Sequence, residues 1–407
     1  MVDPGTRANL LDVLVPLGLA LGLLLLGAEA GCSSSRGTKG AQGETGSVLV
    51  PAVRVKQPLP PSRYRVPTAA LRVSSSWQLA SALARRSPRN IVLAPGTYDS
   101  GKPFSNWYGH RLYAAKLGRA VLRAGIVLGA HEGPVGPVVR GIRFDVADPA
   151  KTFHGAIVHV WGSARNASVL DTSLDGNGVV NAGLIVRQPE GFVGRRLVAT
   201  RFRSYGVLVD VNETDFRARS PYVLEDLDLS HVVRPVPGSS DGTAEACLWL
   251  GSRGTVRRVT VRHCGLMGVW TGTANERSLV EDVTVDRTRV GVYFEHFTTR
   301  AKFQRLRIGP NVSRGINAEW ANPDRGGRPA STHNVILNSY FETTLVGVYL
   351  DEGTTRTSIR RSKFVGQTWA AIGDYRGVDN RYELNDFEEI APGAVPVSFD
   401  HIKRRMR

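Results

Sequence analysis

A five-residue motif recurs along this chain and limits what the chain can fold into. The clearest copies have a small residue, three mostly apolar residues and a carboxylate: Gly291-Val-Tyr-Phe-Glu295, Gly315-Ile-Asn-Ala-Glu319 and Gly347-Val-Tyr-Leu-Asp351. The start moves by 24 residues from Gly291 to Gly315, and a few other steps are longer. A repeat this short cannot bury its apolar residues alone, so it predicts stacked units that share one core. Looser copies start at Gly155, Gly183, Gly206, Ala246, Gly268 and Ala371.

A second series of short β-branched runs lies between successive copies of the motif. Two or three strands in each repeat of about 22 residues would form one coil of a β-helix. A β-propeller or β-sandwich is the alternative fold, but a propeller blade repeats only every ~40 residues. Residues 100–137 fit the pattern poorly, and residues 211–245 and 320–333 are interpreted as insertions. The runs cover residues 256–261, 279–285, 302–308, 334–341, 358–364 and 382–387.

The start of the repeat region has its own signature. Residues 74–86 predict a short helix with a serine N-cap, and a strand at 90–98 follows and stops at a Pro-Gly turn. A short helix followed by Ile-Val-Leu-Ala-Pro-Gly-Thr-Tyr resembles the amino-terminal cap of the pectin-lyase-like superfamily. The resemblance implies an all-β fold, a right-handed single-stranded parallel β-helix with an N-terminal capping helix, over residues 69–400. The apolar face expected on that helix consists of Trp77, Leu79, Ala80 and Leu83.

The two ends of the chain carry different signals. Residues 1–31 predict an export signal peptide, because a leucine-rich stretch ends in Ala28-Glu29-Ala30. Cys32 follows in a setting that resembles a bacterial lipoprotein junction, so lipid anchoring there is an alternative to free secretion. We therefore expect a secreted or cell-envelope protein with no transmembrane span in its mature chain. Residues 32–68 predict a Ser/Gly/Pro-rich linker, and residues 401–407 predict a basic tail.

Charge and cysteine content bear on the partners and the compartment. The formal net charge of +16 suits attraction to a polyanion, such as an acidic polysaccharide. The basic residues are dispersed and no nucleic-acid-binding module is present, so no specific nucleic-acid partner is expected. Besides Cys32 the chain has Cys247 and Cys264. Export permits a disulfide between these two residues, and two buried thiols are the alternative. We expect the protein to be a monomer.

The alternation of side chains along a strand predicts a chemically distinct outer face. The first and third residues after the small residue, such as Val292 and Phe294, are assigned to the core, and the second and fourth point outward. Stacked coils lie about 4.8 Å apart. Glu295, Glu319 and Asp351 are therefore expected to form a column and to serve as the catalytic acid/base set. The residues predicted to bind substrate are Trp270, Tyr293, His296, Asn317, Trp320 and Tyr349.

Closely stacked carboxylates suggest chemistry on polysaccharide. Repulsion raises at least one carboxyl pKa unless a cation intervenes, and such a group can act as general acid beside a basic neighbour. The sequence thus predicts action on a polysaccharide, an acidic glycan, as hydrolase or lyase. No motif of a particular enzyme family is present, so a non-catalytic glycan- or matrix-binding envelope protein is the alternative, with a purely structural envelope protein behind it. No metal site is predicted, and Ca²⁺ held by the carboxylates is the one cofactor considered.

Overall fold

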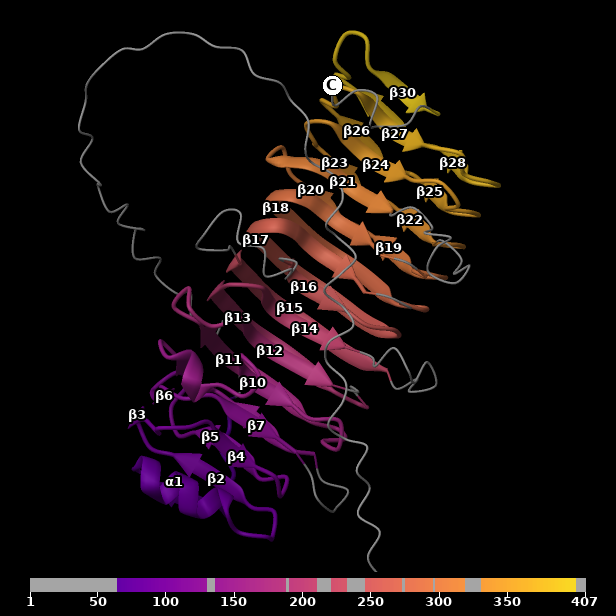
Figure 1. Cartoon of the computed structure of the whole chain (residues 1–407). Coiled ribbons are helices and arrows are strands. Elements are labelled where there is room, and N and C mark those ends of the chain that lie inside the picture. Colours follow the sequence, from indigo (N-terminus) through magenta and orange to yellow (C-terminus); the bar gives the residue numbers. More distant parts are fainter. Residues whose placement is uncertain are drawn as a thin grey trace, which may run out of the picture. The chain divides into compact units, whose positions relative to one another are not determined.

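The chain winds into a stack of parallel coils, and the coils contribute strands to three parallel sheets (Figure 1). The predicted signal peptide (1–31), the basic tail (401–407) and the linker up to residue 63 lie outside the described residues. Within the described ranges no helix is both long enough and apolar enough to cross a membrane. The structure is a computed structural model that describes residues 64–129, 136–187, 190–210, 221–232, 246–272, 275–295, 297–318 and 331–399.

Sheets 1 and 2 are built mostly from strands of two to four residues. Sheet 1 contains β1 (Leu71–Val73), β2 (Asn90–Leu93), β5 (Arg111–Ala114), β8 (Val138–Arg140), β19 (Lys302–Gln304), β22 (Val335–Leu337), β25 (Ser358–Arg360) and β28 (Arg381–Glu383). Sheet 2 contains β3 (Gly96–Tyr98), β6 (Ala120–Leu122), β9 (Arg143–Asp145), β20 (Arg307–Ile308), β23 (Tyr340–Phe341), β26 (Lys363–Val365) and β29 (Asp386–Glu388).

Sheet 3 carries the recurring motif, and long strands in the middle of the stack join the three sheets. The long strands β11 (Ser168–Asp175), β13 (Val193–Phe202) and β15 (Tyr222–Val232) bend from sheet 1 into sheet 2, and β17 (Gly254–Thr271) and β18 (Leu279–Phe294) continue into sheet 3. The other strands of sheet 3 are β4 (Phe104–Asn106), β7 (Ile126–Leu128), β10 (Ala156–Val160), β12 (Ala182–Arg187), β14 (Tyr205–Asp210), β16 (Ala246–Leu250), β21 (Val312–Ala318), β24 (Val346–Leu350), β27 (Ala370–Asp374) and β30 (Val395–Ser398).

The predicted fold, a right-handed parallel β-helix, is confirmed. Two details of the sequence interpretation are corrected. Residues 100–137 contain the regular strands β4 to β7, although they fit the repeat pattern poorly. Residues 211–245 are not one insertion, because β15 lies inside this range and completes a coil. A single 3₁₀ turn, η1 (Pro149–Lys151), precedes β10 among the described residues.

The predicted capping helix is present as α1 (Ser76–Leu83), at the N-terminal end of the stack (Figure 1). The Ser75 side chain accepts a hydrogen bond from the backbone N–H of Gln78, which satisfies one of the free donors of the first turn. Leu79 and Leu83 are buried in the main core, as predicted. Trp77 is 76% exposed and Ala80 is exposed too, so the prediction that these two residues belong to the buried face is wrong.

The small first residue of the motif is required by packing. A Cβ placed on Gly315 would lie 2.2 Å from the carbonyl oxygen of Gly347 and 2.7 Å from the Phe341 ring. The same closeness recurs at Gly291, where the carbonyl oxygen of Gly315 would lie 2.5 Å away. Core side chains of sheet 2, such as Phe341, therefore fill the space that a side chain at this position would need. This close approach of sheet 2 side chains to the first residue of the motif, here called the crossing contact, explains the recurring glycine in the sequence.

The bend between sheets 1 and 2 forms a column of alternating charges, here called the charged corner. Each of its residues has a positive φ, between 51° and 58°, which turns the chain once per coil. Asp226 pairs with Arg258 at 2.6 Å and Asp282 pairs with Arg305 at 2.6 Å. Alternation turns the repulsion that stacked like charges would feel into attraction. In chain order the charged corner consists of Asp171, Arg196, Asp226, Arg258, Asp282 and Arg305.

A disulfide joins two neighbouring coils. Cys247 in β16 and Cys264 in β17 are bonded, with their Cα atoms 5.7 Å apart, and both side chains are buried. Of the two alternatives that the sequence left open, the structure therefore shows the disulfide. Tyr64, which lies in the predicted linker, donates a hydrogen bond to the carbonyl oxygen of Ala114 in β5.

The crossing contact predicts that even a methyl group at the motif's first residue destabilises the fold. The variant Gly315→Ala should lower the free energy of unfolding by about 1–3 kcal/mol, the usual cost of overpacking a core. Gly101→Ala is the matched control, since no atom lies within 4 Å of its added Cβ. Urea unfolding followed by circular dichroism measures both variants. Equal midpoints for the two variants would contradict the packing explanation.

Candidate functional site

The outer face of sheet 3 carries the predicted site, and the strand register places four of its residues in one column. Trp270 pairs with Tyr293, Tyr293 with Asn317, and Asn317 with Tyr349 on successive coils. The alternate residues, such as Val292 and Phe294, are fully buried in the core, as predicted. The column lies outside that core, on the outer side of the sheet.

The register also corrects two looser copies of the motif. The residue of β16 that pairs with Gly268 is Cys247, not Ala246, so Leu248 faces the core and Trp249 faces outward. In β10 the true first residue is Ile157, which the alignment from Gly155 missed. Both copies lack a glycine at the first position. The sequence alignment therefore started from the nearest small residue and was out of register. Trp249 is therefore a site residue that the sequence interpretation did not include.

Three aromatic rings follow one another along the column. The indoles of Trp249 and Trp270 stack with their centroids 4.2 Å apart and an interplanar angle of 15°. The Tyr293 ring then meets Trp270 edge to face at 5.9 Å. Gly272 makes this arrangement possible, because a Cβ there would lie 1.9 Å from Nε1 of Trp249. Trp270 is 8% exposed, while Trp249 and Tyr293 are half-buried.

The two described carboxylates of the predicted set occupy the next outward position. Glu295 and Asp351 follow Phe294 and Leu350, which stand two coils apart in the same column. This corresponds to about 9.6 Å along the stack at ~4.8 Å per coil. The Trp270 indole N–H donates a hydrogen bond of 3.0 Å to Oε2 of Glu295 and so orients the carboxylate. Glu319, His296 and Trp320 lie outside the described residues, so their predicted roles stay predictions.

A cation that was not among the predicted site residues borders the same face. Nη1 of Arg314 in β21 donates a hydrogen bond of 3.0 Å to Oδ1 of Asn317. Burial lowers the pKa of Arg314 and the charge of Arg289 lowers it further, whereas Tyr349, Asp351 and Tyr293 act in the opposite direction. Arg314 therefore brings positive charge to the face where the carboxylates stand. Its position in the sequence, immediately before the small first residue Gly315, was a signal that could have revealed it.

Tyr349 differs from its prediction. It is 1% exposed and packs against Trp369, with ring centroids 5.9 Å apart. Its hydroxyl donates a 3.5 Å hydrogen bond to Oδ1 of Asp351, which also accepts one of 2.8 Å from the backbone N–H of Glu352. The side chain thus lies in the outward column, as predicted, but its ring is buried, which does not fit the predicted contact with substrate. Trp369 covers the ring, and the hydroxyl orients Asp351.

The N-terminal end of the same face is also aromatic. His159 in β10 occupies the column of Trp249 and Trp270, and its side chain is 1% exposed. The rings of Phe153 and Trp161 lie 5.1 Å and 5.5 Å from its ring. Trp161 is 40% exposed. Aromatic rings therefore occur on the outer face at β10 and again at β16 to β18, with Ile185 and Leu208 between them in the column.

The described residues contain no group of three or more His, Cys, Asp or Glu side chains placed to hold a metal ion. The predicted carboxylate column includes Glu319, which lies outside the described residues, so Ca²⁺ stays a prediction.

The coils define the fold of the protein as a right-handed parallel β-helix. No protein-family model matches the sequence, and no curated protein matches it. Among solved structures, PfbA, a surface adhesin of Streptococcus pneumoniae, has a TM-score of 0.54 and 11% identity over 79% of this chain and 87% of that chain. The catalytic domain of a GH87 α-1,3-glucanase in complex with tetrasaccharides has a TM-score of 0.52 and 11% identity over 84% and 70%. The Dettilon tailspike protein has a TM-score of 0.50 and 10% identity over 76% and 64%. These similarities establish the fold.

His159 makes the stability of this face depend on pH. Burial lowers the pKa of His159 to about 4 from 6.5, and the charges of Arg187 and His154 contribute. Between these values the unfolded chain binds a proton that the folded chain does not. Stability from this group is therefore intact above pH 6.5 and falls as the pH drops toward 4, by at most about 1.4 kcal/mol per pH unit. Replacing His159 with Met should flatten the loss of stability in acid.

Urea unfolding at a series of pH values from about 7.5 to about 4 measures how steeply the free energy of unfolding changes with pH. This range covers the pKa of His159 in the unfolded chain, 6.5, and in the folded chain, about 4. The control variant is His333→Asn, since His333 is exposed and has a positive φ that Asn tolerates. The control should keep the slope of the native chain. A His159→Met variant with an unchanged slope would rule out His159 as the group responsible.

Proposed function

We propose that this protein binds polysaccharide along the outer face of sheet 3 and cleaves it there as a hydrolase or lyase. The observation that carries the proposal is the continuous arrangement in which Trp249, Trp270 and Tyr293 lead directly to the oriented carboxylate of Glu295. The half-buried rings of Trp249 and Tyr293 offer apolar surface to the faces of sugar rings, and Trp270 contacts both of them. The carboxylate of Glu295 supplies acid or base chemistry beside them. A glucanase with bound tetrasaccharides among the structures of the same fold supports this reading.

As a hydrolase, the site would use Glu295 and Asp351 on either side of a glycosidic bond. Their two-coil separation of about 9.6 Å along the stack is close to the ~6.5–9.5 Å that leaves room for a water molecule in inverting enzymes. Glu319 ends the motif copy between theirs in the sequence and stays a predicted member of the acid/base set. Tyr349 and Trp270 would act as positioning residues for the two carboxylates.

The charges of the face support an acidic glycan as the substrate. The guanidinium of Arg314, hydrogen-bonded to Asn317, would neutralise a sugar carboxylate in the middle of the column. Neutralising that group is what a lyase requires before a base removes the neighbouring proton, and Tyr293 in the same column is a candidate for this base. The net charge of +16 favours approach of an acidic polymer. Ca²⁺ bound by the carboxylate column would have the same neutralising effect.

The substitution that tests the proposal is Glu295→Gln, which keeps the hydrogen bond from Trp270 possible but removes the charge. Turnover should fall by about 10²-fold or more if Glu295 is a general acid or base. The assay is a screen of acidic and neutral polysaccharides, with and without Ca²⁺, for new reducing ends and for unsaturated sugars. Glu342→Gln, at the residue that directly follows β23 of sheet 2, is the control and should keep full activity. Full activity of Glu295→Gln on a cleaved substrate would refute its assignment.

A second candidate function, non-catalytic binding of glycan or matrix, is favoured by a separate observation. Asp351 accepts hydrogen bonds from Tyr349 and from the backbone of Glu352, a structural use of the carboxylate. A surface adhesin with the same fold is in keeping with this alternative. Binding of glycan by the native chain without release of reducing ends or unsaturated sugars would support it. Loss of that binding in Trp270→Ala would place the bound glycan on this face.

A further inference from the structure

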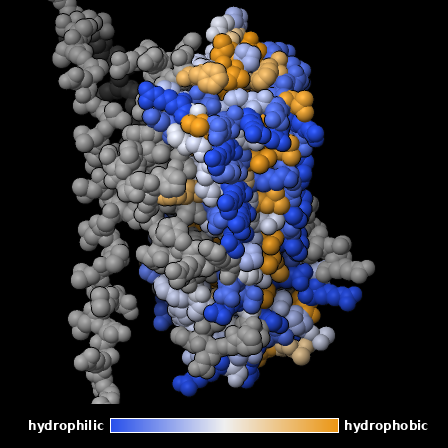
Figure 2. Space-filling model, turned by 90° about the vertical axis from the view of Figure 1, so that its right-hand side faces the viewer, coloured by the Kyte–Doolittle hydropathy of each residue, from blue (hydrophilic) through white to orange (hydrophobic). Residues whose placement is uncertain are grey.

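A second surface stands out on the opposite bend of the coil, where sheet 3 turns into sheet 1. Figure 2 shows a band of hydrophilic side chains running along the stack on this side. Its described residues take one position on successive coils, and each has a positive φ between 51° and 58°. We call this column the arginine corner. It consists of Arg253, Arg277, Arg300, His333 and Arg356, with Asp379 at its end.

The backbone holds the arginine corner rigidly in register. The N–H of Arg277 donates to the carbonyl oxygen of Thr299 at 2.9 Å, and the N–H of Arg300 donates to that of Thr332 at 3.0 Å. Parallel bridges connect the preceding residues from coil to coil. Cationic side chains are thus displayed at a regular interval of about 4.8 Å along the stack, or a multiple of it. A surface with this periodicity suits a linear partner rather than a compact one.

Three arginines of the corner are exposed and share two acidic partners among the described residues. The side chains of Arg277, Arg300 and Arg356 are 55%, 59% and 60% exposed. Glu276 lies 3.3 Å from Arg277 and 4.0 Å from Arg300, and Asp379 lies 3.6 Å from Arg356. This differs from the charged corner, where each acid is matched by an arginine.

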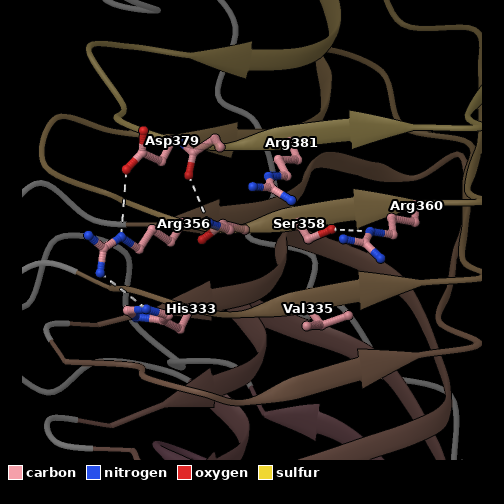
Figure 3. A pocket seen from close by; sticks show the side chains of 9 residues that line it. His333, Val335, Arg356, Ser358, Arg360, Asp379 and Arg381 are labelled. Atoms are coloured by element: carbon pink, nitrogen blue, oxygen red, sulfur yellow. Dashed lines mark hydrogen bonds and ion pairs between the residues drawn. The ribbon is translucent and has the colours of Figure 1, made fainter.

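The C-terminal end of the arginine corner opens into a hollow of about 620 Å³ on sheet 1 (Figure 3). Arg356 at the bend before β25, Arg360 in β25 and Arg381 in β28 of the next coil line it together with Ser358. Arg360 is paired with Glu383 at 3.2 Å. Arg381 forms no ion pair with any residue that the structure describes, and its side chain is exposed. The hollow therefore contains a guanidinium available to an anionic ligand.

We propose that the arginine corner and this hollow bind a linear acidic polysaccharide, at a site separate from the outer face of sheet 3. Carboxylate groups on successive sugars would pair with Arg300, Arg356 and Arg381, since guanidinium matches carboxylate geometry. The hollow's lining includes no Trp, Tyr or Phe, the rings on which single-stranded nucleic acids stack their bases. A polyuronate therefore fits this surface better than a nucleic acid. The site would hold an acidic polymer whether or not the sheet 3 face cleaves it.

The test uses the full chain and measures its affinity for polygalacturonate, a linear polyuronate, at low salt. The corner variant combines Arg300→Asn, Arg356→Asn and Arg381→Gln. Asn tolerates the positive φ of the first two positions, so the bend is preserved. The charge-matched control combines Arg72→Gln, Arg86→Gln and Arg119→Gln, three exposed arginines in the N-terminal coils. Equal urea midpoints for both variants and the native chain establish that the fold is kept.

The corner variant should bind polygalacturonate about tenfold more weakly than the native chain, because three exposed charge contacts are lost. The control should bind within about twofold of native under the same reasoning. Cleavage is scored separately, by the release of reducing ends or unsaturated sugars in the Glu295→Gln assay, so this proposal and the proposed cleavage fail separately. Equal losses in the corner and control variants would overturn the proposal, as would no binding by the native chain. Equal or tighter binding of single-stranded DNA would also overturn it.

A second measurement needs no variant. Polygalacturonate should protect Arg300, Arg356 and Arg381 of the native chain from phenylglyoxal, with modification mapped by mass spectrometry. Arg72 and Arg119 should be modified equally with and without the polymer. Protection at the control arginines and not at the corner would overturn the proposal.

Discussion

The structure depends on one geometric constraint, which is that every residue of a coil lies about 4.8 Å from its counterpart on the next coil. Equivalent positions on successive coils therefore form a column, and the side chains in a column must be able to lie next to one another. Apolar residues satisfy this by packing, as Val292 and Ile316 do in the core. Glycine satisfies it at the first position of the motif, where Phe341 and its equivalents need the space. At the charged corner, charged residues satisfy it by alternating, as Asp282 and Arg305 do.

The same constraint builds both candidate surfaces. On sheet 3 it stacks Trp249 on Trp270 and sets Glu295 beside them, so a site arises from residues far apart in the chain without any special loop. At the arginine corner it repeats a cation from coil to coil and makes a surface suited to a repeating polymer. A β-helix converts sequence periodicity into spatial periodicity, which is a natural match for partners that are themselves periodic.

Much of the fold could be predicted because glycine and β-branched residues report the coil directly. The same signals correctly predicted one column for Trp270, Tyr293, Asn317 and Tyr349, because the motif copies there are clear. Prediction failed where the signal was absent. Cys247 and Ile157 replace the small residue, so the alignment slipped and Trp249 was missed. The burial of Tyr349 could not be predicted either, because it depends on Trp369, whose ring reaches back over the preceding coil. Neither corner was predicted, because a positive φ at Asp or Arg has no sequence signal comparable to glycine.

The alternating signs of the charged corner bear on how such a chain can change its length in evolution. If the single coil that carries Arg258 were duplicated, two arginines would become neighbours in the column, and the alternation that begins with the contact between Asp226 and Arg258 would be broken. Duplicating two coils together would restore the order. This part of the β-helix is therefore expected to gain or lose coils in pairs during evolution, although its structural repeat is a single coil. Gains and losses of coils should be easier near the C-terminal end, where Asn338, Arg361 and Leu384 occupy the corner and no alternation has to be kept.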